Sequence, residues 1–366
     1  MRFNDHDTWI ENSLQNVTSY FKSGKNINAK MILEEGLYPV YGGNGIRGFT
    51  NTYNQDGKYI LVGRQGALCG NVRLVEGKSY VTEHGIIIIN NNQSTIEYLK
   101  PLLEHMHLEK ESDQSAQPGL AVNKLLLLKQ YFPSIENQER IGKLFTLLEM
   151  KIQLQNKIIE DLKLLKDSII DYLYNHNGGL EYKFKDLYTK AKEGGTPSTT
   201  VTSYYKNGQI PFIKIDDLNS KYIIHNQTYI TNEGMKNSSA WLIPINSVIL
   251  SNGATIGVTS INTYPVTTKQ GILGIIPSKL VNYEYLYYLL NTSVFKKNLK
   301  KITTKGTMEC AYIKDIDNII LRVPTLDVQL KSVKILNSLD KRLAIENNMI
   351  NEYKDQKIYL LRNLFI

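Results

Sequence analysis

Few short motifs in this chain have the residue types and spacing that catalysis requires. Asp216-Asp217 could act as paired acids, but no Glu-x-Lys follows at the spacing found in nucleases, so a solvated turn is favoured. Glu352-Tyr353-Lys354 has that spacing, yet it lies in a long predicted helix with Tyr353 on the apolar side. The sequence contains neither a Gly-x-x-x-x-Gly-Lys-Ser/Thr phosphate loop nor the Asn-Pro-Pro-Tyr type of motif used by amino-methyltransferases. We therefore expect no catalytic residues in this chain.

Two other motifs suggest ligand binding but lack the context that binding needs. Gly43-Asn44-Gly45-Ile46-Arg47-Gly48 fits the dinucleotide pattern, but a turn-rich segment follows it in place of an apolar helix. A glycine loop that presents Arg47 is the better interpretation. His105-Met106-His107 has no cysteine or carboxylate set to complete a metal site, and Cys69 and Cys310 occupy unrelated positions. The sequence thus predicts no metal and no cofactor in this chain.

Charge and composition favour a polyanionic partner. The chain has 366 residues, a net charge of +8 and a pI near 9.0, and neutralising phosphates releases counterions. Composition alone still leaves open a basic protein that binds no nucleic acid. No apolar run approaches the ~20 residues that span a bilayer, and the polar segment from Met1 to Asp7 does not resemble a secretory signal. We expect a cytoplasmic protein.

The clearest long-range feature is a duplicated segment. Pro133-Ser134-Ile135-Glu136-Asn137-Gln138 returns 191 residues later as Pro324-Thr325-Leu326-Asp327-Val328-Gln329, and each segment opens a long helical pattern. A serine or threonine N-cap with a carboxylate in the first turn is typical of a helix start. Apolar residues then recur at alternating steps of four and three, which is a heptad pattern. These seam positions are Ile141, Phe145, Leu148, Ile152, Gln155, Ile159, Leu162, Lys166, Ile169 and Leu173 in the first helix, and Ser332, Leu336, Leu339, Leu343, Glu346, Ile350, Tyr353, Lys357, Leu360 and Leu364 in the second.

The two helices are expected to pack against each other in antiparallel orientation. Even their polar seam positions correspond, because Gln155 matches Glu346 and Lys166 matches Lys357. The alternative, that each helix lies on its own domain, is less favoured because so long a stripe exceeds the width of a small domain. We predict an α+β protein with an internal pseudo-twofold repeat, in which two β-rich domains are separated by a coiled coil. The predicted ranges are 1–133 for the first domain, 134–178 for the first spacer helix, 179–324 for the second domain and 325–366 for the second spacer helix.

Within each domain the pattern predicts short strands separated by glycine and asparagine turns. Strands are expected at 59–62, 86–89, 247–250 and 272–276, with helical stretches at 96–107 and 283–301. The domains share a weaker correspondence. Gly66-Ala67 with Gly70 matches Gly253-Ala254 with Gly257, and Val81-Thr82 matches Val266-Thr267. Duplicated scaffolds with different loops suit two different binding specificities.

The chain resembles the specificity (S) subunit of type I restriction–modification systems. The residues that carry the resemblance are Tyr38-Pro39-Val40-Tyr41-Gly42-Gly43-Asn44-Gly45, Gly63-Arg64-Gln65-Gly66-Ala67, Gly194-Gly195-Thr196-Pro197-Ser198, Ile210-Pro211-Phe212-Ile213, Lys305-Gly306-Thr307 and the two helix starts. The resemblance implies two target recognition domains, each recognising one half of a split DNA sequence. It also implies docking of two methyltransferase subunits and recruitment of restriction subunits. S-adenosylmethionine is then expected in the methyltransferase, and ATP with Mg in the restriction subunit.

Candidate base contacts follow from residue chemistry. Arginine or lysine pairs with guanine, and asparagine or glutamine pairs with adenine. Residues of these types in or beside the glycine-rich turns and motifs are Asn44, Arg47, Arg64, Gln65, Lys214, Asn252, Lys269, Gln270 and Lys305.

Two other functional classes remain open. One is a coiled-coil adaptor that joins two proteins through its β-rich domains without binding DNA. The other is a single-chain restriction–modification enzyme whose catalytic motifs are not apparent in the sequence.

Overall fold

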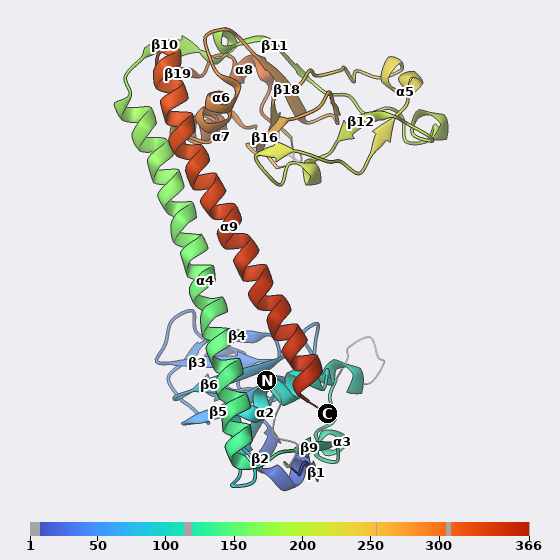
Figure 1. Ribbon diagram of the computed structural model, residues 1–366, viewed down its shortest axis with the longest axis vertical. Coiled ribbons are helices and arrows are strands. Elements are labelled where there is room, and N and C mark those ends of the chain that lie inside the picture. The colour runs from blue at the N-terminus through green and yellow to red at the C-terminus, as the bar shows by residue number, and fades with distance from the viewer. Residues whose placement is uncertain (1–7, 113–118, 254, 305–308, 366) are drawn as a thin grey trace. The chain divides into compact units, whose positions relative to one another are not determined.

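The computed structural model describes residues 8–112, 119–253, 255–304 and 309–365 (Figure 1). The chain divides into two compact units. Unit 1 comprises Met1–Lys157 with Asn347–Ile366, and unit 2 comprises Ile158–Glu346. Two long helices, α4 (Ile135–His176) and α9 (Leu326–Leu364), each contribute one half to each unit. No described helix has an apolar stretch long enough to cross a bilayer.

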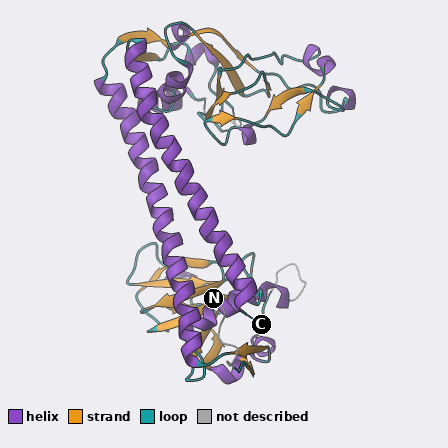
Figure 2. Cartoon of the chain, in the orientation of Figure 1, coloured by secondary structure: helices purple, strands orange, loops and turns teal. Residues whose placement is uncertain are grey.

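Unit 1 contains two main sheets (Figure 2). The four-stranded sheet has the order β2-β8-β5-β6, and the three-stranded sheet has the order β4-β3-β7. A short pair, β1 with β9, joins the beginning and end of the domain. The elements are β1 (Ile10–Ser13), α1 (Leu14–Val17), β2 (Thr18–Ser23), η1 (Ala29–Met31), β3 (Tyr38–Gly42), β4 (Gly45–Thr50), β5 (Lys58–Gly63), β6 (Val72–Glu76), β7 (Tyr80–Val81), β8 (Gly85–Asn90), α2 (Ile96–His105), η2 (Leu108–Glu111), α3 (Val122–Leu126) and β9 (Lys129–Phe132).

Unit 2 repeats this topology with one added strand, β13, at the edge of its larger sheet. Its sheets have the orders β11-β18-β15-β16-β13 and β14-β12-β17, and β10 pairs with β19 as β1 does with β9. The elements are β10 (Leu180–Lys183), η3 (Phe184–Leu187), β11 (Tyr188–Glu193), η4 (Thr202–Tyr204), β12 (Ile210–Ile213), η5 (Ile215–Asp217), β13 (Tyr222–Ile223), β14 (Tyr229–Ile230), α5 (Asn232–Lys236), β15 (Val248–Ser251), β16 (Thr259–Asn262), β17 (Thr267–Thr268), β18 (Ile272–Pro277), α6 (Tyr283–Leu289), α7 (Ser293–Ile302), α8 (Ile313–Ile316) and β19 (Ile320–Val323).

The duplicated β-rich architecture is therefore confirmed, with two corrections. The helical stretch predicted at 283–301 is two helices, because Thr292 caps a new start by accepting a hydrogen bond from the Phe295 amide. The proposed match of Val81-Thr82 with Val266-Thr267 is wrong by two residues. Val81 pairs in parallel with Tyr41, and the equivalent parallel partner of Ile213 is Thr268. Strand pairing sets the register in a sheet, and weak sequence similarity does not reveal that pairing.

The two long helices pack in antiparallel orientation within each unit. In unit 1 the rings of Phe145 and Phe365 stack with centroids 5.9 Å apart. In unit 2 the Asn177 amide donates to the Ser332 hydroxyl at 2.8 Å. Every seam position named above is buried or half-buried. Leu148, for example, is 5% exposed, and burying such a side chain contributes roughly 1.5 to 3 kcal/mol.

The lysines in the seam form the same ion pair twice. Lys357 contacts Glu149 at 2.7 Å in unit 1, and Lys166 contacts Asp340 at 2.5 Å in unit 2, with each partner displaced by 191 residues in sequence. Burial alone would raise the pKa of Glu149, but the ammonium groups of Lys100 and Lys357 outweigh burial and hold that pKa below its usual value. Polar groups within an apolar seam restrict the register of the helices.

The glutamine of each helix-start motif attaches the long helix to its own domain. The Oε1 atom of Gln138 accepts from the Thr95 amide at 3.0 Å, and its Nε2 donates to the carbonyls of Gln93 and Pro133. Gln329 makes the equivalent bonds to Asn282, Leu280 and Pro324. Thr95 and Asn282 are the N-caps of α2 and α6. The repeated glutamine thus joins the start of the long helix to the start of the domain helix in both units.

Candidate nucleic-acid interface

The candidate residues gather at the same sheet edge in both units. The parallel strands β3 and β7 end there in unit 1, as β12 and β17 do in unit 2. Equivalent main-chain hydrogen bonds form just beyond these strands. The Thr82 amide donates to the Tyr41 carbonyl at 2.9 Å, and the Lys269 amide donates to the Ile213 carbonyl at 3.0 Å. The turn that follows β5 or β15 joins the same edge. The Arg64 amide donates to the His84 carbonyl, and the Asn252 amide donates to the Gly271 carbonyl.

In unit 1 the tip of the β3–β4 hairpin packs directly on the turn after β5. A methyl group built on Gly43 would lie 2.5 Å from the Gln65 carbonyl oxygen, so only glycine permits this approach. The Oδ1 atom of Asn44 accepts from the Leu68 amide at 3.3 Å and ties the two turns together. The Oε1 atom of Gln65 lies 2.7 Å from Nδ1 of His84. Asn44 and Gln65 are both exposed, so each carboxamide faces solvent while its oxygen is held by a hydrogen bond.

Arg47 lies beside these side chains, but in strand β4 and not in the glycine loop that the sequence suggested. Its side chain passes over Gly42. Arg73, which sequence analysis did not select, extends from β6 to the same hairpin and places its guanidinium over Gly45. Within a strand, Arg73 has no neighbouring glycine or turn motif that would have distinguished it from an ordinary surface residue.

In unit 2 the equivalent edge carries lysines. Lys214 and Lys269 directly follow the parallel strands β12 and β17, and both are exposed. Gln270 is also exposed, and its main-chain N–H donates to the Thr196 hydroxyl at 3.3 Å. The adjacent Gly271 amide donates to Glu193 Oε1 at 2.6 Å. Two cationic side chains and one carboxamide are therefore held on a short, hydrogen-bonded segment.

Two candidates have a structural role at equivalent positions. The Nε atom of Arg64 donates to the Leu120 carbonyl at 3.3 Å, and the Nδ2 atom of Asn252 donates to the Ala311 carbonyl at 3.1 Å. Arg64 is half-buried, and Asn252 is only 4% exposed. Both were selected because they lie in or beside glycine-rich turns, but in the structure each side chain fastens its turn to a distant loop. Lys305, the remaining candidate, lies outside the described residues.

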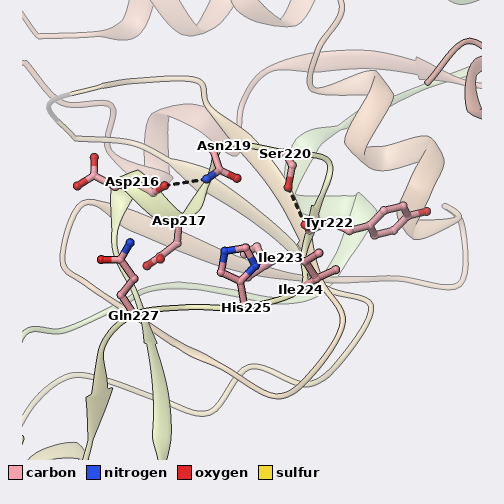
Figure 3. Close-up of a pocket in the computed structure, with 9 residues that line it drawn as sticks. All are labelled: Asp216, Asp217, Asn219, Ser220, Tyr222, Ile223, Ile224, His225 and Gln227. Atoms are coloured by element: carbon pink, nitrogen blue, oxygen red, sulfur yellow. Dashed lines mark hydrogen bonds between the residues drawn. The ribbon is translucent and has the colours of Figure 1, made fainter. Parts of the chain in front are cut away.

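Asp216 and Asp217 line a small pocket with a volume of about 30 Å³ (Figure 3). The Oδ2 atom of Asp217 accepts from the Lys214 amide at 2.8 Å, so this carboxylate caps the turn that carries Lys214. His225 and Gln227 also line the pocket. Over the described residues no group of three or more His, Cys, Asp or Glu side chains is arranged to hold a metal ion.

The match to a known protein family agrees with this geometry. The family model for the type I restriction modification DNA specificity domain matches residues 6–164 and again residues 180–354. The chain belongs to this family. The two matched segments correspond to the duplicated halves that the topology shows.

Individual relatives match parts of the chain. The type I restriction enzyme EcoprrI specificity subunit of Escherichia coli is 41% identical over 143 residues, which cover 38% of this chain and 35% of that protein. The MjaIX specificity subunit of Methanocaldococcus jannaschii is 30% identical over 187 residues, covering 50% of this chain and 43% of that protein. These matches span less than half the length of either curated relative. The S subunit structure from M. genitalium has a TM-score of 0.64 at 16% identity and covers 100% of this chain and 98% of that one, which supports the fold.

Proposed function

We propose that this chain recognises a bipartite DNA sequence in the cytoplasm and has no catalytic activity of its own. Each β-rich domain recognises one half of the sequence. The observation that carries the proposal is the pair of equivalent sheet edges, which have the same main-chain frame but different exposed side chains. Asn44, Arg47 and Gln65 project from one, and Lys214 and Lys269 project from the other. Because the side chains differ, the two half-sequences are free to differ and the target need not be a palindrome.

The chemistry of these side chains suits DNA. Lysine and arginine contact phosphates and guanine, while glutamine and asparagine amides pair with adenine in the major groove. Membership of the type I restriction modification DNA specificity family supports the same conclusion. The net charge of +8 favours binding to a polyanion.

The proposal extends to partner proteins. Two methyltransferase subunits dock on the duplicated helices and restriction subunits join them, so that this chain directs where both act. The methyl donor S-adenosylmethionine is bound by the methyltransferase, and ATP with Mg by the restriction subunit. Two quasi-equivalent docking sites follow from the duplication, because α4 and α9 begin at positions 191 residues apart and form the same ion pair in each unit.

Equilibrium DNA binding tests this proposal. The chain, in complex with its methyltransferase subunits, should bind duplexes that contain its target with an affinity that falls steeply as salt rises, since each neutralised phosphate contributes a slope of about −0.9. Scrambling either half of the target should weaken binding. Salt-insensitive or absent DNA binding by a complex that retains its protein partners would instead favour the adaptor function.

A further inference from the structure

The β3–β4 hairpin of unit 1 has an irregular register at Arg47. Gly42 pairs with Gly45 and Tyr41 with Ile46, but Val40 pairs with Gly48. Arg47 is therefore the extra residue of a β-bulge. A bulge redirects the side chain of the extra residue and increases the local twist. Gly48, which follows Arg47, has a φ of +147°, a backbone conformation that favours glycine.

The two paired glycines leave room for two arginine side chains. A methyl group built on Gly42 would lie 2.6 Å from Cδ of Arg47, and one built on Gly45 would lie 2.8 Å from Nη1 of Arg73. Residues paired across a hairpin point to the same face. Arg47 and Arg73 therefore cover one face of the hairpin at its tip, and side chains at either glycine would displace them.

Among the residues that the structure describes, neither Arg47 nor Arg73 forms an ion pair or a side-chain hydrogen bond. Arg64, by contrast, donates to main-chain carbonyls. Because Gly42 and Gly45 are a cross-strand pair, the two cationic side chains cover neighbouring positions of the hairpin, where an anionic ligand would compensate their charge. A bulge, two glycines and two uncompensated cations at one hairpin tip are the features of a binding element.

We propose that this hairpin is the guanine-recognising element of the first domain, a proposal that rests on the function proposed above. Arg47 is exposed on the bulge and makes the bidentate contact to O6 and N7 of one guanine in the major groove. Arg73 is half-buried, extends from β6, and contacts the backbone phosphate beside that base. The first half-sequence therefore contains a guanine that is recognised through Arg47, while Arg73 contributes affinity without specificity.

The test uses the chain in complex with its methyltransferase subunits. The sequence context of the modified DNA and the affinity for the wild-type target are measured for Arg47→Ala, Arg47→Lys, Arg73→Ala and Gly42→Ala. Lys129→Ala is the control, because it removes an exposed cation from the β1–β9 pair of the same unit, which belongs neither to the hairpin nor to the long helices. Gly42→Ala is informative because the three atoms nearest to its methyl group all belong to the flexible Arg47 side chain, and Gly42 does not have a positive φ.

Arg47→Ala should reduce discrimination at one guanine of one half-sequence by roughly tenfold to a hundredfold and leave the other half unchanged. Arg47→Lys should lose part of this discrimination, because lysine keeps the positive charge but lacks the planar guanidinium that makes two parallel hydrogen bonds. Gly42→Ala should shift specificity in the same direction. Arg73→Ala should weaken binding to all sequences and reduce the salt slope by about one. Lys129→Ala should change neither property.

Two results would overturn the inference while the proposed function stands. One is that the wild-type complex recognises a bipartite target and the Arg47→Ala complex recognises the same target sequence with the same discrimination. The other is an Arg47→Ala complex that loses affinity equally for all sequences, since that behaviour identifies a phosphate contact. A wild-type complex with no sequence preference would refute the proposed function itself.

Discussion

Removal of the Gln138 side chain should loosen unit 1 at the junction between its β-rich domain and helix α4. Gln138 is 1% exposed and makes three hydrogen bonds to main-chain groups of Thr95, Gln93 and Pro133. Each bond contributes about 1 kcal/mol net, and each buried group left without a partner costs about 1 to 3 kcal/mol. Allowing for water that satisfies some of these groups, Gln138→Ala should destabilise the junction by about 3 kcal/mol.

Amide hydrogen exchange followed by mass spectrometry measures this effect by segment. A loss of about 3 kcal/mol raises the population of the locally open state by roughly a hundredfold. The loss of protection should be greatest in α2 and in the first turns of α4. Gln329→Ala is the matched control, because Gln329 makes the equivalent bonds in unit 2 and is 0% exposed. Its effect should be greatest at α6 and the start of α9.

The reasoning fails if Gln138→Ala leaves the protection of α2 within a few-fold of the wild type. It also fails if the two variants alter the same segments to the same extent. Either result would mean that the repeated glutamine does not join the long helix to the domain beside it.

Three further predictions concern the helices. The pKa of Glu149 is held below its usual value of 4.5 in the folded chain, so its ionised carboxylate stabilises the fold above pH 4.5. This contribution is lost as the pH falls through the pKa of the folded state. Melting temperatures measured from pH 6 to pH 3 should therefore decline less for Glu149→Gln than for the wild type. Insertion of four residues after Ile159, about one helical turn, should change the number of unspecified bases between the half-sequences by one or two and leave both half-sequences intact, and sequencing of modified DNA would expose an altered half-sequence as a contradiction. Native mass spectrometry at saturating partner should give two methyltransferase subunits per chain, and a single tightly bound copy, or none, would refute the duplicated docking site.

The helices were the most predictable part of the fold. A heptad pattern is local, and the repeat of 191 residues predicted helices from residues 134 and 325, one residue before the starts at Ile135 and Leu326 that the structure shows. The buried β5, β8, β15 and β18 strands were also apparent from continuous apolar runs. The break between α6 and α7 was missed, because a single capping threonine outweighs a continuous helical pattern.

The candidate interface was less predictable because side-chain availability depends on distant contacts. Arg64 and Asn252 stand in glycine-rich segments that suggest exposure, but their partners Leu120 and Ala311 lie more than 50 residues away in sequence. Arg73 was missed because its approach to Gly45 depends on the pairing of separate strands. Arg47 was selected for its glycine neighbours, whereas its orientation is set by the register of the bulge.

The most direct test of the central claim is the DNA sequence that is methylated in cells. Modified bases are mapped in cells that express this chain with its methyltransferase subunits, in cells that lack the chain, and in cells with the Lys214→Ala and Lys269→Ala double variant. We predict a bipartite modified sequence that requires the chain, and a double variant that relaxes one half while the other remains intact. A continuous unsplit sequence, modification that persists without the chain, or changes in both halves of the variant's target would contradict the account.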